Sequence, residues 1–441
     1  MTSPAIDQEA LRPAFDADFL NQLLARGIQV IRVIHSDLFG RQRGKQYPVK
    51  SLLHLEGGVA YSKMANAEDL MGVPVDDKEF PSLATHPDLH AHLDLQTAFV
   101  PPWEPDSLWV LSRLSEHGRP SELCPRSQLT RANEILGTTL GLDAVAAGEP
   151  EFYLFRNDAN GSSVPYATNG VSYTMDRITD PDGAVGRIHR QLIGMDIGVT
   201  VVNREFSPGQ FEINLMHDEV LGAADSAFLL KSGIKELAIL EGMEANFMAK
   251  PVTEEEGSSL HVHLSLWKGG ENVFATPEGG LSPEALWAIA GIQAHAAAIM
   301  AFAAPTVNSY KRLSGAGLSP RTSNWDEDNR FTFIRIPAER GRATRLELRA
   351  GDASASPHLL MAAMLHAAGD GIRRGLTPDA AGVPLPRSLE ESVAALEKNE
   401  VFRDGFGEEF VGIYAALKRR EVQGFAAAVT DWEWNLYRRH S

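Results

Sequence analysis

Two carboxylates one residue apart, on a segment that otherwise reads as a buried strand, constrain this chain more than any other feature. The segment is Gly-Glu-Pro-Glu-Phe-Tyr-Leu-Phe, residues 148–155, and its acids are Glu149 and Glu151. A strand turns alternate side chains to opposite faces, so both carboxylates share one face. Paired acids usually lie on a solvated face, but the apolar run that follows argues against that reading. Two such charges raise each other's pKa unless a cation lies between them, and a divalent metal ion is the simplest candidate.

The composition is that of a globular protein with more than one domain. The chain has 441 residues, of which 44% are hydrophobic and 22% charged. A net charge of −17 without any basic run argues against a nucleic-acid partner. Cys124 is the only cysteine, which excludes an internal disulfide and a multi-thiolate zinc site. Residues 1–18 do not have the pattern of a signal peptide, so we expect a cytoplasmic protein.

One apolar stretch, residues 286–304, is long enough to raise the question of a membrane span. It is rich in alanine, contains Gln293 and His295, and follows Ser282-Pro283-Glu284, a favourable start for a helix. We therefore predict a buried helix of a soluble protein over residues 282–303 and no membrane partner.

Local patterns predict a small β-rich domain followed by a large α+β domain. Residues 28–53 predict two strands joined by a turn at Asp37-Leu-Phe-Gly40, and the stretch 73–120, rich in Pro, Asp and His, predicts loops and short strands. Further strands are expected at 144–155, 199–206, 210–216, 260–267, 331–336 and 344–349. Helices are expected at 127–141, 184–196, 222–243, 282–303, 357–373, 388–398 and near 407–419.

A second pair of acids, Glu205 and Glu212, flanks the turn Ser207-Pro208-Gly209. The turn residues predict that the two glutamates lie on paired strands on either side of it. Acids that flank a hairpin are common on solvated surfaces, so the pair by itself leaves both interpretations open.

The next group is His261, His263 and Ser265, which alternate along a predicted strand and so share a face. A polar outer face of a surface strand is the alternative interpretation. Two histidines without cysteine suit zinc, but together with several carboxylates they suit Mg²⁺ or Mn²⁺ better.

The last group is rich in arginine. Arg345, Glu347 and Arg349 alternate on one predicted strand, and the remaining members are Arg312, Arg330 and Arg335. A solvated strand would carry such a pattern too, but guanidinium groups also bind carboxylates and phosphates in bidentate fashion. The combined set suits metal-assisted phosphoryl transfer to or from a carboxylate substrate.

These stretches, in this order, resemble the glutamine synthetase superfamily over nearly the whole chain. The resemblance implies a small N-terminal β-grasp domain, residues 1–124, and a large catalytic domain, residues 125–441, with an antiparallel sheet and flanking helices. It also implies ATP and two or three Mg²⁺ (or Mn²⁺) ions, and assembly into a homododecamer whose active sites lie between subunits.

Residue roles follow from the same resemblance. One metal ion would be held by Glu151, Glu205 and Glu212, and a second by Glu149, His261 and Glu347. The nucleotide would be bound by His263, Ser265, Arg335 and Arg345. Glutamate and the transferred phosphoryl group would be bound by Gly257, Arg312, Arg330 and Arg349, with Arg330, Arg349 and Glu347 as the catalytic residues.

Two departures from the family pattern concern the site for ammonium. Tyr61 and Leu318 stand where true glutamine synthetases carry an aspartate and a glutamate, and Leu318 follows Arg312 by six residues. Ammonium is strongly hydrated, so a site without these carboxylates should bind it poorly. Glu68 and Asp69 lie near Tyr61 in the sequence and offer an alternative source of charge.

Further departures point to a different amine. Glu256 replaces an asparagine, and the ending Trp432-Glu-Trp-Asn-Leu-Tyr is similar to that of glutamate–amine ligases in the superfamily. We therefore predict an ATP-dependent ligase that joins the γ-carboxylate of glutamate to a polyamine, ethanolamine or another primary amine. The alternatives are a true glutamine synthetase and a catalytically inactive structural or regulatory relative.

Overall fold

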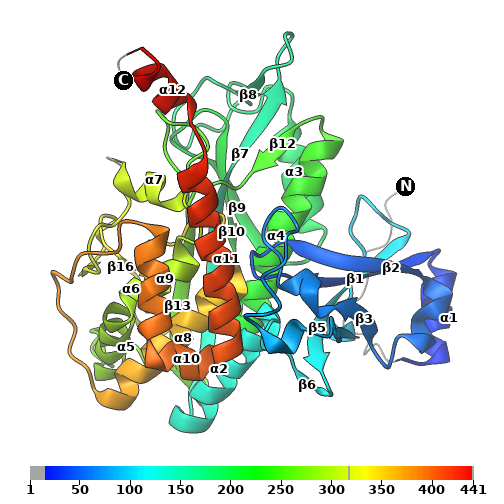
Figure 1. Cartoon of the computed structure of the whole chain (residues 1–441), viewed down its shortest axis with the longest axis horizontal. Coiled ribbons are helices and arrows are strands. Elements are labelled where there is room, and N and C mark those ends of the chain that lie inside the picture. Colours follow the sequence, from blue (N-terminus) through cyan, green and yellow to red (C-terminus); the bar gives the residue numbers. More distant parts are fainter. Residues whose placement is uncertain (1–14, 316–317, 440–441) are drawn as a thin grey trace.

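The computed structural model describes residues 15–315 and 318–439, and it confirms the predicted α+β fold. A smaller N-terminal sheet lies beside a larger sheet packed against helices (Figure 1). The N-terminal sheet has the order β2-β1-β5-β4-β3, with β6 paired to β5, and is grasp-like. Its strands are β1 (Val30–Ser36), β2 (Gln42–Pro48), β3 (Val59–Ser62), β4 (Asp88–Leu93), β5 (Ser107–Glu116) and β6 (Arg119–Pro120).

The predicted turn between the first two strands is present, and its sequence explains it. Asp37 Oδ1 accepts hydrogen bonds from the backbone N–H groups of Phe39 and Arg41 at 3.0 and 2.9 Å. Gly40 has a φ of 70°, and a Cβ there would lie 3.0 Å from the Cα of Ser356 in the catalytic domain. Glycine therefore meets two requirements at this position, a left-handed backbone and a close contact between the domains.

The prediction for residues 73–120 was wrong in one respect. The ten-residue strand β5 pairs with β1 in parallel and with β4 in antiparallel fashion, so it lies in the centre of the sheet. Its residues are buried on both faces, and the period-2 alternation that marks a half-buried strand is absent. The first helix of the described residues, α1 (Ala17–Ala25), was not predicted; it buries Phe19 and Leu23. Short 3₁₀ turns lie at Val49–His54, Lys63–Asn66, Pro81–Leu83 and Leu95–Thr97.

The large sheet is built around β7 (Asp143–Asn157), the strand that carries Glu149 and Glu151. The order is β15-β16-β17-β13-β7-β10-β9, and all neighbours are antiparallel except β15 and β16. The strands are β9 (Val199–Arg204), β10 (Gln210–Leu215), β13 (Leu260–Lys268), β15 (Trp325–Glu327), β16 (Ile334–Ile336) and β17 (Leu346–Leu348). Four short strands extend it, namely β8 (Ser163–Pro165), β11 (Asp218–Glu219), β12 (Glu244–Asn246) and β14 (Glu271–Asn272).

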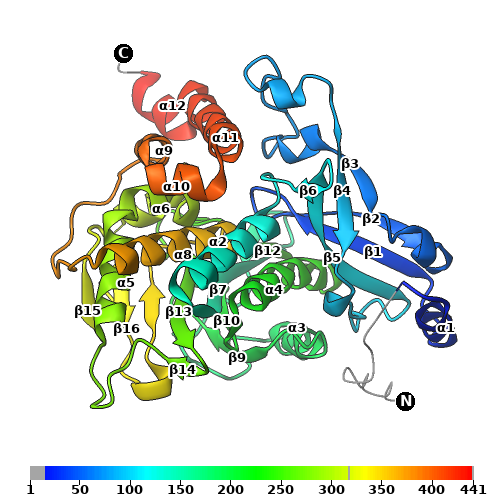
Figure 2. The ribbon, with the colours of Figure 1, turned by 90° about the horizontal axis from the view of Figure 1, so that it is seen from below.

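Helices α2 (Pro125–Leu140), α4 (Val220–Leu240) and α8 (Pro357–Arg374) cover one face of this sheet (Figure 2). Gly148 allows close packing there, since a Cβ would lie 3.4 Å from the side chain of Ala227 on α4. The other helices are α3 (Ala184–Ile193), α7 (Ser309–Ser314), α9 (Leu389–Lys398), α10 (Glu400–Phe406), α11 (Glu408–Ala427) and α12 (Asp431–Tyr437), with a 3₁₀ turn at Gly341–Ala343.

The helix predicted over 282–303 is two helices, α5 (Pro283–Ala294) and α6 (Ala296–Ala303), which meet at an angle of 75°. His295 lies at the break, where its ring bonds Asp370 at 3.0 Å and Asn399 at 2.8 Å. The apolar residues of both helices are largely buried. Among the described residues, no single helix is long and apolar enough to span a membrane. Helices α5 and α6 reach that length and hydropathy only when they are taken together as a bent pair.

A buried ion network joins the two domains. Arg126 at the start of α2 binds Asp94 of the N-terminal domain and Asp225 of α4, both at 2.9 Å. His358 of α8 binds the same Asp225 at 2.9 Å. Burial by itself would raise the pKa of Asp225, but His358 and Arg126 hold that pKa below its usual value. The network therefore connects the N-terminal sheet to α2, α4 and α8 with paired charges.

Candidate active site

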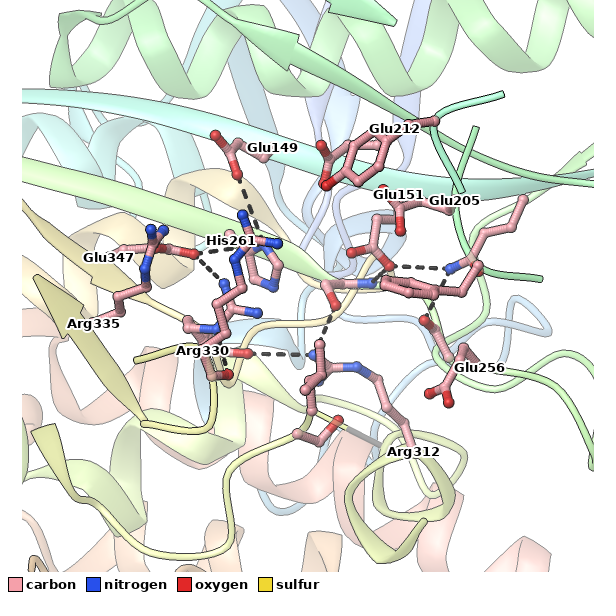
Figure 3. Close-up of a pocket in the computed structure, with 18 residues that line it drawn as sticks. Glu149, Glu151, Glu205, Glu212, Glu256, His261, Arg312, Arg330, Arg335 and Glu347 are labelled. Carbon is pink, nitrogen blue, oxygen red and sulfur yellow. Dashed lines mark hydrogen bonds and ion pairs between the residues drawn. The ribbon is translucent and has the colours of Figure 1, made fainter. Parts of the chain in front are cut away.

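A cavity of about 330 Å³ lies at the centre of the large sheet, and most of the predicted site residues line it (Figure 3). They come from β7, β10, β13, β16 and β17, from α7 (Ser309–Ser314) and from the loops between these elements. The lining residues are Glu149, Glu151, Tyr173, Glu205, Phe206, Gln210, Glu212, Glu256, Gly257, Ser259, His261, Arg312, Leu318, Ser319, Arg330, Arg335, Glu347 and Arg349.

Strand register determines which side chains lie opposite Glu149 and Glu151. Glu149 of β7 lies opposite His261 of β13, whereas Glu151 lies opposite Glu212 of β10. β7 pairs with both neighbours, one on each side, so adjacent acids on the same face meet different partners. The two carboxylates therefore belong to two separate groups of side chains.

The first group consists of Glu151, Glu205 and Glu212. Burial, followed by the charge of Glu151, raises the pKa of Glu205 to about 7. Burial and then Glu151 and Glu149 raise the pKa of Glu212 to about 9. Such crowding of buried carboxylates is unfavourable without a cation, so these oxygen donors fit a hard divalent ion such as Mg²⁺ or Mn²⁺.

Neutral donors hold this group in place. The side chain of Gln210 and the backbone N–H of Ser259 donate to the same oxygen of Glu151, at 3.1 and 2.9 Å. The amide of Asn203 donates to Glu205 at 2.7 Å. These hydrogen bonds orient the carboxylates without neutralising them, and so leave their charge for a ligand.

The second group joins Glu149, His261 and Glu347. His261 Nδ1 lies 3.7 Å from an oxygen of Glu149 and 3.8 Å from an oxygen of Glu347. Ligand atoms of Glu149, His261 and Glu212 also lie within 4.8 Å of one another, as do those of Glu149, His263 and Glu347. Glu149 and His261 of the second group therefore also lie close to Glu212 of the first group.

Neighbouring histidine and arginine side chains lower the pKa values of two carboxylates in this second group. Burial by itself would raise the pKa of Glu149, but the adjacent side chains of His261 and His263 hold it far below its usual value. Burial likewise opposes ionisation of Glu347, and His261, His263, Arg349 and Arg335 lower its pKa to about 2. Both carboxylates are therefore ionised at neutral pH.

The predicted arginines differ in how many hydrogen bonds and ion pairs their guanidinium groups already make within the protein. Arg312 is buried and donates to Ser259 Oγ at 2.9 Å and to the carbonyl of Ala350 at 3.1 Å. Arg335 and Arg349 both bind Glu347, the former at 2.8 Å. The guanidinium of Arg330 lines the cavity, and within the described ranges it makes no hydrogen bond. Arg330 is therefore the arginine with the most capacity to bind an anionic substrate.

A second cavity, of about 610 Å³, contains the remaining residues predicted to bind the nucleotide. It is lined by His263, Ser265 and Arg345, whereas Arg335 lines the first cavity. Arg345 Nε donates to His263 Nδ1 at 3.2 Å, which leaves Nε2 as the N–H that faces Glu149 at 3.1 Å. Glu149 lines both cavities, so it marks their boundary.

Gly257 lies at the edge of the cavity, where the backbone packs closely against Arg312. A Cβ at this position would lie 2.4 Å from the carbonyl oxygen of Ala249 and 2.7 Å from Arg312 Cγ, so only glycine fits. Its own carbonyl accepts from Gln210 at 3.0 Å. The backbone therefore passes directly over Arg312 at the edge of the cavity.

The two candidates for the amine site lie apart. Leu318 lines the first cavity. Tyr61 lies on β3 of the N-terminal domain, where its ring packs edge-on against His35 at 4.8 Å between centroids, outside the cavity of its own chain. Only Leu318 thus reaches the cavity from within the chain.

Sequence patterns did not single out several residues of this cavity. Gln210 and Ser259 could have been found, because Gln210 precedes Glu212 by two positions and so shares its face, and Ser259 precedes His261 in the same way. Tyr173 and Phe206 carry no such signal. They are exposed loop residues, 60% and 56% accessible, and only the fold brings them to the cavity.

Comparison with known proteins agrees with this geometry. Residues 122–437 match the family described as glutamine synthetase, catalytic domain. The chain is 34% identical to glutamate–isopropylamine ligase of Pseudomonas sp over 95% of its own length and 96% of the relative's. It is 35% identical to glutamine synthetase of Methanocaldococcus jannaschii over 78% of this chain and 81% of that protein.

Solved structures show the same likeness. A complex of GmaS with ADP superposes with a TM-score of 0.84 at 30% identity, covering 96% of this chain and all of the other. GmaS without ligand gives the same TM-score and identity. Since both the catalytic-domain match and the full-length similarity extend over most of the sequence, the chain is a member of the glutamine synthetase family.

Proposed function

We propose that this protein joins the γ-carboxylate of L-glutamate to a primary amine, in particular a small alkylamine, and converts ATP to ADP and phosphate. One observation carries the choice of amine. Leu318 lines the same cavity as Arg312, Arg330 and Arg349, and the family resemblance implies that it stands where ammonium-using members carry a glutamate. An apolar group there favours the alkyl part of an amine and stabilises ammonium poorly.

Two aromatic side chains extend this apolar surface. Tyr173 and Phe206 line the cavity together with Leu318. Aromatic faces attract alkylammonium cations and also contact their alkyl groups. Glutamate–isopropylamine ligase, which aligns over 95% of this chain, supports the same choice.

The proposed metal assignment follows the two acidic groups. Glu151, Glu205 and Glu212 would hold one divalent ion, and Glu149, His261 and Glu347 a second. Such ions, when bound, offset the negative charge of the nucleotide phosphates. The side chains of His263, Ser265, Arg335 and Arg345 would contact the nucleotide, and ATP would then lie in the second cavity with its phosphates near Glu149.

The arginines of the first cavity would bind glutamate and the transferred group. Arg312 and the backbone at Gly257 lie at one side, and Arg330 and Arg349 supply charge for the phosphoryl group. A γ-carboxylate oxygen attacks the terminal phosphorus, the bond to ADP breaks, and γ-glutamyl phosphate forms. The amine nitrogen then attacks the acyl carbon, loses a proton and displaces phosphate.

The test is phosphate release from ATP and glutamate with one amine at a time. The panel contains ammonium, methylamine, isopropylamine, ethanolamine, putrescine and spermine. We expect an alkylamine to give the highest kcat/KM. Ammonium as the best substrate would instead establish a glutamine synthetase, and a lack of turnover with every amine would establish an inactive relative.

The variant Leu318→Glu tests whether Leu318 contacts the amine. It should move the selectivity towards ammonium by about tenfold or more, because it adds a charge partner for a small cation. Leu318→Gln is the matched control, with the same shape and no charge, and should not produce that change. If both variants keep the selectivity of the unmodified protein, Leu318 does not contact the amine.

A further inference from the structure

A separate, strongly basic cavity lies where the turn between β1 and β2 meets α4 and α11. Its volume is about 440 Å³. Among the described residues that line it, four side chains are cationic, Arg41, Lys231, Lys235 and Lys418, and one is acidic, Glu421. The active-site cavity shares none of these residues.

Lys231 of α4 is the most incompletely paired of these cations. It is 8% exposed, and its ammonium makes one hydrogen bond within the described structure, to the carbonyl of Ala353 at 2.6 Å. An ammonium has three N–H donors, so two remain for a ligand. Burial lowers the pKa of Lys231 to about 7, as expected for a charge with so little compensation.

Lys418 of α11 is in a similar position. It is 1% exposed, and its nearest carboxylate oxygen, on Glu421, lies 4.0 Å away. The other oxygen of Glu421 accepts from the backbone N–H of Val307 at 2.8 Å. Lys418 also lies over the rings of Phe39 and Tyr414, at 4.4 and 5.1 Å, and these provide attraction but no lone pair for its protons.

The remaining two cations differ. The guanidinium of Arg41 is already paired within the protein, because it binds Asp37 at 2.7 Å and the carbonyl of Leu70 at 3.1 Å. Lys235 lies at the solvent-exposed edge of the cavity, over the ring of Phe247 at 5.6 Å. The charge available to a ligand therefore comes from Lys231 and Lys418 inside and from Lys235 at the entrance.

An unpaired hydroxyl completes the site. Ser356 lines the cavity and is 4% exposed, and its Oγ has no hydrogen-bond partner among the described residues. Buried polar atoms are almost always paired in folded proteins. The hydroxyl and the two ammonium groups belong to residues that line one cavity, and together they form a donor set with few acceptors.

We propose that this cavity binds a compact dianion, either a tetrahedral oxyanion of the phosphate type or a short dicarboxylate. Its negative groups would accept hydrogen bonds from Lys231, Lys418 and Ser356. Asp352 and Asp37 attract the ammonium of Lys231, but in the described structure neither forms a salt bridge with it. A buried cation with so little counter-charge destabilises the folded protein, and an anion of this size offsets that cost. The proposal rests on residues outside the active site, so it is independent of the function proposed above.

The test is calorimetric titration of the full-length protein, without nucleotide or metal ion, with sulfate and separately with succinate. Sulfate represents the tetrahedral oxyanion and succinate the dicarboxylate, so the preferred probe identifies the class. Lys231→Met should weaken binding by about tenfold or more, because it removes a charged donor of similar shape. Ser356→Ala should weaken it less.

Two controls locate the bound anion. Lys50→Met removes an exposed lysine elsewhere on the N-terminal domain and should leave the affinity unchanged. Arg330→Gln removes an anion-binding group from the active site and should also leave it unchanged. If Arg330→Gln abolishes binding while Lys231→Met does not, the anion occupies the active site and the proposal is wrong.

Two further outcomes are decisive. Wild-type protein that binds neither probe at millimolar concentration overturns the proposal. The melting temperature of Lys231→Met without anion should equal or exceed that of the wild type, because the variant no longer buries the charge. If Lys231→Met does not fold, the test uses the milder variant Ser356→Ala. An unchanged affinity of Ser356→Ala for the anion would refute the role of the hydroxyl.

Discussion

Glu151 of β7 and Glu212 of β10 are direct cross-strand partners, so two carboxylates face each other inside the cavity. Like charges opposite one another destabilise a sheet. Burial, and then the charges of Glu151 and Glu149, raise the pKa of Glu212 to about 9, so ionisation of both carboxylates is unfavourable without a cation. The sheet therefore retains an unfavourable interaction between two buried carboxylates, and a bound metal ion would offset it.

We expect Glu212→Gln to separate metal binding from folding. The metal-free variant should be as stable as the wild type or more stable, by up to about 1 kcal/mol, because the repulsion is removed. The increase in melting temperature that Mn²⁺ gives the wild type should be largely lost. Thermal unfolding with and without Mn²⁺ measures both effects. Glu219→Gln, which replaces an exposed glutamate of β11, is the control. Equal responses of the two variants would contradict the assignment of Glu212 as a metal ligand.

Arg330→Gln should lower kcat/KM for glutamate by about a hundredfold or more, while the melting temperature stays close to that of the wild type. The guanidinium lines the cavity without a hydrogen bond in the described structure, so its removal breaks no internal hydrogen bond. Steady-state kinetics with varied glutamate measures the loss. Arg330→Lys, which keeps the charge but not the planar fork, should recover only part of it. An unaffected Arg330→Gln would exclude a role for Arg330 in catalysis or substrate binding.

Tyr61 lies outside the cavity of its own chain, so we predict that it acts on the cavity of a neighbouring subunit in a homododecamer. Tyr61→Asp should shift the selectivity towards ammonium, and Arg330→Gln should be nearly inactive. Hybrid oligomers of the two variants should regain alkylamine activity, because some sites would combine an intact Arg330 with the neighbour's intact Tyr61. Activity no greater than the sum of the separate variants would show that Tyr61 does not act between subunits. Light scattering of the unmodified protein checks the size of the assembly.

Acid should destabilise the protein through His366. This residue of α8 is buried against Phe402 and Phe406, and burial lowers its pKa from 6.5 to about 4. Between these values the unfolded chain binds a proton that the folded chain does not, so stability falls as the pH drops through this window. The free energy of unfolding should fall by about 2 kcal/mol from this group between pH 7 and 5.

The comparison of two variants isolates this effect. His366→Leu should show a smaller loss of stability on acidification than the wild type, measured by denaturant unfolding at each pH. His90→Leu, which replaces an exposed histidine of β4, should keep the wild-type dependence. Identical pH profiles for His366→Leu and the wild type would show that His366 does not bind a proton on unfolding in this range.

Several parts of the fold could be predicted because they depend on local periodicity. The strands that carry Glu149, Glu212, His261 and Glu347 lie where alternation and turn residues placed them. β5 was missed because a strand buried on both faces lacks alternation, and the break at His295 was missed because Asp370 and Asn399, far along the chain, stabilise it. The division of the domains at residue 124 stays a prediction.

The sequence by itself determined which side chains share a face, since the period of a strand is a local property of the backbone. It therefore specified the acids, histidines and arginines of the active site. Tertiary structure decided which of them meet, because register across β7 assigns Glu149 to His261 and Glu151 to Glu212. It also placed Tyr173 and Phe206 at the cavity and enclosed Lys231 and Lys418 between two domains. Burial and charge pairing arise only when distant segments pack, so no local pattern encodes them.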